Sequence, residues 1–60
     1  MLEKNKKYIL TFSVGGKLLT YEGIILDIDS QNIYFKDKYN KELQFRKDIL
    51  ISAEKIGDSK

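Results

Sequence analysis

Apolar and polar residues alternate along much of this 60-residue chain. In Tyr8–Val14 (YILTFSV) every second residue is large and apolar, and this period of two predicts a strand with one buried face. Gly15 and Gly16 follow directly, and consecutive glycines supply the positive φ angles that a two-residue hairpin turn requires. The pattern therefore predicts an antiparallel hairpin between Tyr8–Val14 and the next strand, Lys17–Ile28.

The predicted strand Lys17–Ile28 is long, since strands usually have about 5–6 residues. Gly23 stands in its middle, where a glycine indicates a bend or a close approach of another backbone. A bend also explains the run Ile24–Leu26, because three consecutive apolar residues can face one core only if the strand twists or bulges. A cluster of turn-forming residues, 29–32, then predicts a hairpin with the strand that follows.

Two short alternating segments, Asn32–Lys36 and Glu42–Arg46, predict a third and a fourth strand joined by the polar loop 37–41. Antiparallel pairing of the two places their large apolar residues on one inward face: Ile33, Phe35, Leu43 and Phe45.

Arg46–Asp48 predicts a tight polar turn, of the length of one 3₁₀ turn, before a fifth strand at Ile49–Ile56. A helix over Ile49–Ile56 is the alternative, because Ala53–Lys55 tolerates helical structure. Five short strands predict an all-β fold, a five-stranded antiparallel meander closed into a small barrel, since closure removes exposed sheet edges. We expect one domain over residues 1–60 with an ordered core at about 8–56 and mobile termini.

Composition narrows the chemistry of the chain. It has no cysteine and no histidine, so it has no disulfide, no thiolate metal site and no imidazole base. Asp27, Asp29 and Asp37 could supply oxygen ligands to a divalent cation, but turn capping is the favoured role because no calcium-loop spacing is present. No acid–base couple stands out, and we expect a protein that is not an enzyme and that uses no metal or cofactor.

The charge balance gives little indication of a partner by itself. Eleven Lys and Arg against nine Asp and Glu leave a net charge of +2. No apolar run approaches the ~20 residues of a membrane span, and residues 1–7 have no signal-peptide pattern, so we expect a cytoplasmic protein without a membrane partner.

Tyr21, Gly23 and Ile25 place an apolar residue, a glycine and a second apolar residue on the bent second strand, and Asp29 and Asn32 stand in the turn that follows it. This spacing resembles the Sm-like RNA-binding family of small barrels, whose second strand is strongly bent and carries the same three residue types. An aspartate follows six residues after the glycine, as Asp29 does, and an asparagine opens the third strand, as Asn32 does. The resemblance implies an SH3-like barrel that binds RNA in the loops beside these last two residues.

The family's second motif is matched only in part by Phe45–Lys47. An apolar residue, an arginine and a glycine are expected there, and Lys47 stands in the place of the glycine. The turn from Asp29 to Asn32 is also one residue shorter than is usual in the family. The resemblance further implies ring assembly, in which Ile49–Ile51 would pair with the fourth strand of a neighbouring copy.

The candidate nucleic-acid site combines this resemblance with the outward residues of the third and fourth strands. Sheet faces that bind single strands pair a base-stacking aromatic residue with cations that meet phosphates. The candidate residues are Asp29, Asn32, Tyr34, Lys36, Gln44, Arg46 and Lys47. The alternative is an ordinary solvated face, on which Tyr34 packs over the aliphatic stems of Lys36 and Arg46. The predicted partner is RNA or single-stranded DNA.

A second class of function is open at this point, a protein-interaction or self-assembly module. Some apolar residues exceed what one thin core needs, and such residues can form an interaction surface. They are Tyr8, Ile9, Ile24, Leu26, Tyr39 and Leu50. Either a homo-oligomer or another protein partner would cover them, unless twist and bulges bury them within a monomer.

Overall fold

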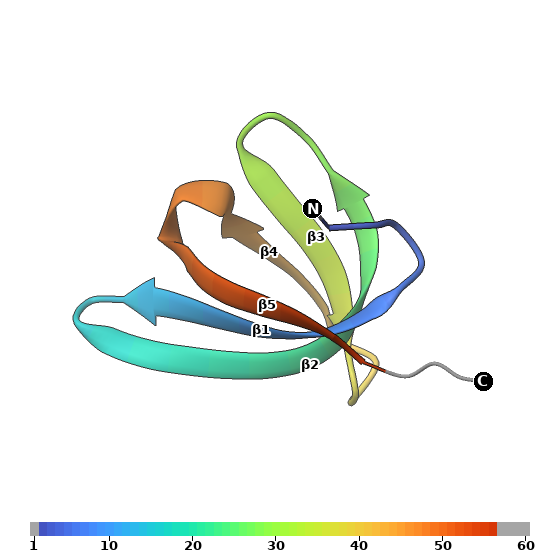
Figure 1. The fold of residues 1–60 in the computed structure, drawn as a ribbon, viewed down its shortest axis with the longest axis horizontal. Coiled ribbons are helices and arrows are strands. Elements are labelled where there is room, and N and C mark those ends of the chain that lie inside the picture. Colours follow the sequence, from blue (N-terminus) through green and yellow to red (C-terminus); the bar gives the residue numbers. More distant parts are fainter. Residues whose placement is uncertain (1, 57–60) are drawn as a thin grey trace.

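The computed structural model describes residues 2–56, and the mobile tail predicted at 57–60 lies outside the described residues. The chain forms five strands and one short 3₁₀ helix (Figure 1). They are β1 (Lys7–Val14), β2 (Lys17–Ile28), β3 (Asn32–Asp37), β4 (Glu42–Arg46), η1 (Lys47–Ile49) and β5 (Leu50–Ile56). Within the described residues, no helix is long and apolar enough to cross a membrane.

The strands form one antiparallel sheet in the order β4-β3-β2-β1-β5. The all-β prediction is confirmed, and the helical alternative for 49–56 is wrong because Leu50–Ile56 pairs with β1, although Ile49 belongs to η1. The sheet is not closed: over residues 2–56, β4 and β5 are its two edges and do not pair with each other. The short η1 carries the chain between these edges, and β5 makes its ladder along β1 instead.

Strand β2 bends and belongs to two parts of the sheet. Its first part pairs with β1, and its last part, from Gly23 to Ile28, pairs with β3, where Figure 1 shows the strand changing direction. A bulge between Ile25 and Asp27 shifts the register. Ile24, which is 39% exposed, and Ile25, which is fully buried, point to opposite faces as neighbours on a strand do, and Leu26 at the bulge is half-buried.

Gly23 lies close against β3. A β-carbon at this position would lie 2.7 Å from the Lys36 carbonyl oxygen and 2.8 Å from a ring carbon of Phe35. Both distances are shorter than a real β-carbon contact, and the first involves backbone that cannot rotate away. The close approach predicted from the sequence is confirmed.

The core lies inside the curled sheet. Its six buried residues are Tyr8, Leu10, Phe12, Ile25, Ile33 and Phe35. Leu43 and Phe45 pack against them from β4, as their alternation predicts. The ring centroids of Phe12 and Phe45 are 4.3 Å apart in an edge-on arrangement, although β2 and β3 lie between their strands. The contact shows how strongly the sheet curls.

Tyr8 corrects one expectation, because it belongs to the core and not to the surplus apolar surface. It is 4% exposed, and its hydroxyl accepts a hydrogen bond from the Glu3 backbone N–H at 2.9 Å. The N-terminal segment is also tied down by two backbone bonds to β2, Asn5 N–H to the Ile25 carbonyl and Ile25 N–H to the Lys6 carbonyl. Its polar sequence gave no sign of these contacts, because backbone groups make them.

The remaining surplus residues divide into two groups. Ile9, Leu26 and Leu50 are half-buried by the twist and bulges of the sheet. Ile24 and Tyr39 stay exposed, and three further apolar residues join them: Val14, Leu18 and Ile51. The protein therefore exposes apolar side chains as predicted, but only Ile24 and Tyr39 are among the residues that the sequence indicated.

Replacing Gly23 by alanine should destabilise the protein by about 1–3 kcal/mol, the usual cost of overpacking. The added methyl would otherwise stabilise by only about 0.4–1 kcal/mol, through a less flexible unfolded chain, so the clash with Lys36 dominates. Urea unfolding of Gly23→Ala measures the change. Ser52→Ala, at an exposed position on β5, is the matched control. Equal midpoints for Gly23→Ala and the unaltered protein would contradict the role of the close approach.

Candidate nucleic-acid interface

The register of β3 and β4 brings most of the predicted site onto one face. Asn32 pairs with Arg46 and Tyr34 pairs with Gln44, and all four point away from Ile33 and Phe35 in the core. Lys36 pairs with Glu42 on the same face. The prediction that these outward residues share a surface is confirmed. The acidic Glu42, which was not among the predicted site residues, lies on the same surface beside Lys36.

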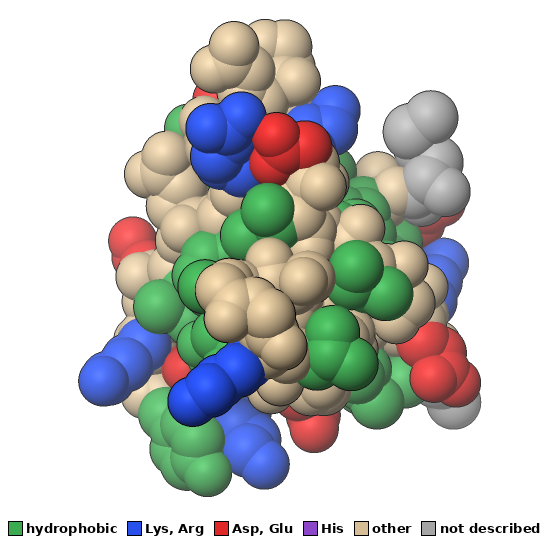
Figure 2. All heavy atoms as spheres, turned by 90° about the vertical axis from the view of Figure 1, so that its left-hand side faces the viewer, with side chains coloured by type: hydrophobic (Ala, Val, Ile, Leu, Met, Phe, Trp, Pro, Cys, Tyr) green, Lys and Arg blue, Asp and Glu red, His purple; other side chains and the backbone are tan. Residues whose placement is uncertain are grey.

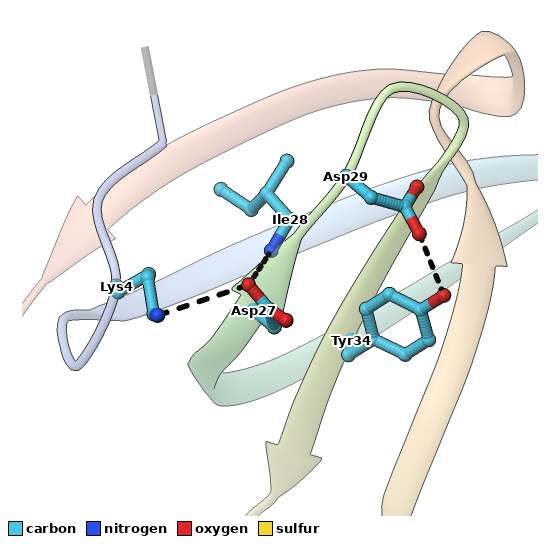
Figure 3. A network of polar contacts seen from close by, with 5 residues as sticks. All are labelled: Lys4, Asp27, Ile28, Asp29 and Tyr34. Atoms are coloured by element: carbon cyan, nitrogen blue, oxygen red, sulfur yellow. Dashed lines mark hydrogen bonds and ion pairs between the residues drawn. The ribbon is translucent and has the colours of Figure 1, made fainter.

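Asp29 organises the turn between β2 and β3. One of its carboxylate oxygens accepts hydrogen bonds from the backbone N–H groups of Gln31 at 2.8 Å and Asn32 at 2.6 Å. The other accepts a hydrogen bond from the Tyr34 hydroxyl at 2.8 Å, and Figure 3 shows the ring reaching from β3 towards the turn. Asp29 thus holds the turn and fixes the direction of the Tyr34 side chain.

These bonds stabilise the ionised form of one group and the protonated form of the other. The Gln31 N–H, followed by the Tyr34 hydroxyl and the Asn32 N–H, keeps the pKa of Asp29 below its ordinary value of 3.8. The hydrogen bond to Asp29 raises the pKa of Tyr34 above its ordinary value of 10.0. At neutral pH Asp29 is a carboxylate and Tyr34 is a neutral hydrogen-bond donor.

The two loops of the predicted site lie against each other. The Lys47 backbone N–H donates to the Gln31 carbonyl at 2.8 Å, which ties η1 to the β2–β3 turn. Between them lies a hollow of about 500 Å³, which we call the η1 hollow. Its lining residues are Ser30, Gln31, Asn32, Arg46, Lys47 and Asp48.

The composition of the η1 hollow was only partly predicted. Asn32, Arg46 and Lys47 are among the residues chosen from the sequence, whereas Ser30, Gln31 and Asp48 were missed. These three residues stand in the same two turns as the predicted ones, and this position in the sequence could have identified them. Lys36 lies apart from this hollow, because it pairs with Glu42 at the other end of the β3–β4 ladder.

Acidic groups partly neutralise the cations of the site. The Arg46 guanidinium and the Asp48 carboxylate form an ion pair at 2.8 Å, with both side chains mostly exposed. On the side of the molecule drawn in Figure 2, Lys and Arg side chains lie next to acidic side chains near the top of the view. Exposed ion pairs contribute only about 0–1 kcal/mol, so an incoming phosphate can replace Asp48 at little cost.

The other aspartates considered for a metal act in turns and pairs. Asp37 accepts hydrogen bonds from the backbone N–H groups of Tyr39 and Lys41, both at 2.9 Å. Asp27 lies 3.8 Å from the Lys4 ammonium and accepts the Ile28 N–H, as Figure 3 shows. Turn capping by Asp29 and Asp37 is confirmed. Among residues 2–56, no three His, Cys, Asp or Glu side chains are grouped to hold a metal ion.

Comparisons with protein-family models, with curated protein sequences and with solved structures find no match to this chain.

The Asp29 carboxylate should make the stability of the fold sensitive to acid. Because its folded-state pKa is lowered, its contribution is complete above the ordinary value of 3.8 and is lost as the pH falls through the lower folded-state pKa. The melting temperature of the unaltered protein should therefore fall more steeply between about pH 5 and about pH 2 than that of Asp29→Asn, which keeps an oxygen acceptor without ionising.

Circular dichroism melts across this pH range measure both curves. Glu54→Gln removes a carboxylate from an exposed position on β5 and is the control for net charge. If the acid curves of Asp29→Asn and the unaltered protein are parallel, the Asp29 bonds do not contribute to stability as described.

Proposed function

We propose that the protein is a small non-catalytic nucleic-acid-binding module that favours RNA or other single strands. The observation that carries the proposal is the bond between Lys47 and Gln31, which joins two loops into one hollow with cations and amide side chains. Tyr34 stands on the adjoining face with its hydroxyl held by Asp29. Cations, amide side chains and an aromatic ring are the groups with which proteins contact the phosphates, base edges and base faces of a single strand.

In the proposed mode of binding, each group has a separate role. Arg46 and Lys47 meet phosphate oxygens, with Arg46 exchanging its contact with Asp48 for the ligand. The side chains of Gln31 and Asn32 offer both donors and acceptors to base edges. Asp29 acts by positioning, because its oxygens already accept hydrogen bonds from the turn and from Tyr34.

Single strands are favoured over duplex because the proposed base contacts need unstacked bases. Tyr34 offers a half-buried ring on a sheet face, and a ring can stack only on a base whose own face is free. No chemistry is required of the site, and the chain has neither histidine nor cysteine to supply a common base or nucleophile. A cytoplasmic location is part of the proposal.

We also propose that the fold is a variant of the SH3-like, Sm-like architecture. The bent β2, its central Gly23 and the return of β5 to the edge of β1 support this relationship. The position of Lys47 in place of a glycine distinguishes the chain from the family pattern.

Arg46→Ala should weaken binding of a labelled single-stranded oligonucleotide and lower the salt dependence. Removing one phosphate contact to a single strand reduces the slope of log K against log salt by about 0.7. Fluorescence anisotropy at several salt concentrations measures both quantities. Lys17→Ala, which removes a cation at the β1–β2 turn, is the matched control. An Arg46→Ala variant that folds normally and binds with the same affinity and slope would contradict the proposed site.

Self-assembly is the second candidate function, and the two unpaired sheet edges favour it. Strands β4 and β5 each have only one neighbour within residues 2–56, and Ile51 on β5 is 59% exposed. Open edges with apolar residues readily pair with another strand. Pairing of β4 of one copy with β5 of the next would continue the sheet across copies and would bury Ile51.

Ile51→Lys should abolish such association, because a charge on an edge strand opposes pairing with another edge. Sedimentation equilibrium over a range of protein concentrations should give an oligomer for the unaltered protein and a monomer for Ile51→Lys. Thr20→Lys introduces the same charge at an exposed position on the internal strand β2 and should leave the mass unchanged. A monomeric mass for the unaltered protein at every concentration would rule out this function.

A further inference from the structure

A second group of cations and an aromatic ring lies at the opposite end of the β3–β4 hairpin from the η1 hollow. It consists of Lys7, Lys36, Lys38 and Tyr39, and we call it the hairpin-tip cluster. We propose that the hairpin-tip cluster is a second contact for the same single strand, with Tyr39 stacking on a base and the lysines meeting phosphates. This inference rests on the proposed function and extends its site across the hairpin.

The β3–β4 turn holds Tyr39 in a defined place. The Asp37 carboxylate accepts the N–H groups of Tyr39 and Lys41, and the Asp37 N–H donates to the Lys41 carbonyl at 2.8 Å. Asn40 completes the turn in the left-handed region, with φ of 66°. Tyr39 remains 73% exposed, so the turn presents an aromatic ring to solvent on a fixed backbone.

Tyr39 already has a cation beside it. The Lys38 ammonium lies 5.5 Å from the Tyr39 ring centroid, the only cation–aromatic contact among residues 2–56. The same two side chains line a hollow of about 430 Å³ that also reaches Tyr21. A base stacked on the exposed part of the ring would have its phosphate close to Lys38. Stacking on an aromatic ring tolerates any base, because every base has a π face.

The lysines of the cluster surround a smaller, adjacent hollow of about 260 Å³. Lys7 and Lys36 lie in one row across the outer face, each paired with Ile24 of β2. Two acidic residues also line this hollow, but the Asp37 carboxylate caps the turn, and Glu22 lies 4.0 Å from Lys7. Glu42 is opposite Lys36 in the register. Lys38, in contrast, lies over the Tyr39 ring. The cluster can therefore contact a base through Tyr39 and the neighbouring phosphate through Lys38.

The two ends of the hairpin are spaced for one extended ligand. Arg46 and Glu42 are at opposite ends of β4, about 14 Å apart because an antiparallel strand rises about 3.4 Å per residue. Tyr34 and Gln44 lie on the same face between them. A strand that follows this face would pass from the η1 hollow over Tyr34 to the hairpin-tip cluster. An OB-fold, another small β-barrel, binds about 4–16 nucleotides of single strand, and a strand in this range is long enough to reach both ends.

The test compares oligonucleotides of two lengths. Labelled RNA oligonucleotides of about 3 and about 12 nucleotides are titrated with the unaltered protein, Tyr39→Ala, Lys38→Gln, Arg46→Ala and the control Lys17→Gln. The longer RNA should bind more tightly to the unaltered protein. Tyr39→Ala should weaken binding of the longer RNA by about five-fold or more, the lower end of what one stacked base contributes. Binding of the shorter RNA, held in the η1 hollow, should change only in Arg46→Ala.

The outcomes separate this inference from the function on which it rests. If Arg46→Ala weakens binding of both RNAs while Tyr39→Ala and Lys38→Gln bind the longer one normally, the hairpin-tip cluster is not a contact and the proposed function stands. If the unaltered protein binds neither RNA, both proposals fail, and the exposed Tyr39 would be a surface for a protein partner. Melting curves establish that Tyr39→Ala folds, as expected for a side chain so exposed.

Discussion

The features of this fold follow from the way its sheet curls over a cluster of aromatic rings. Phe45 on the edge strand β4 reaches Phe12 on β1 across two intervening strands, and Tyr21 and Phe35 complete the cluster. A flat sheet would leave these rings exposed on one face. The curl requires β2 to serve two partners, and Gly23 permits this because any side chain there would meet the backbone of β3. A chain of this size buries only about 60% of the surface that its unfolded form exposes, so its thin core depends on these contacts.

The same curl creates the surfaces that we propose as functional. It brings the β2–β3 turn against η1, so that a backbone bond from Lys47 to Gln31 closes the η1 hollow. The curl does not close the sheet, so the edges of β4 and β5 remain unpaired within residues 2–56, which gives self-assembly a physical basis. The proposed binding would use the loops and the outer face, and the proposed assembly would use the backbone edges, so the two proposals are compatible.

Charge compensation sets the character of the proposed interface. Arg46 forms an ion pair with Asp48, and Lys7 lies near Glu22. The hydrogen bond from the Gln31 N–H lowers the pKa of Asp29 most, and the charge of Lys47 lowers it further by favouring the ionised carboxyl. A ligand would exchange these exposed pairs for phosphate contacts, which favours modest affinity with little non-specific attraction, in keeping with a net charge of only +2. Selectivity would then depend on the rings of Tyr34 and Tyr39 and on the amide side chains of the β2–β3 turn.

Local signals in the chain were enough to predict the strands, their inward faces and the position of the bend, because alternation, paired glycines and a central glycine act over a few residues. They also placed Tyr34 and Arg46 on one face, since antiparallel pairing fixes which residues are neighbours. The open sheet, the burial of Tyr8 and the bond from Tyr34 to Asp29 emerged from the three-dimensional arrangement alone. These features depend on how far the sheet curls and on how the turns and the N-terminal segment lie against the strands, which the alternation of residues along the chain does not record.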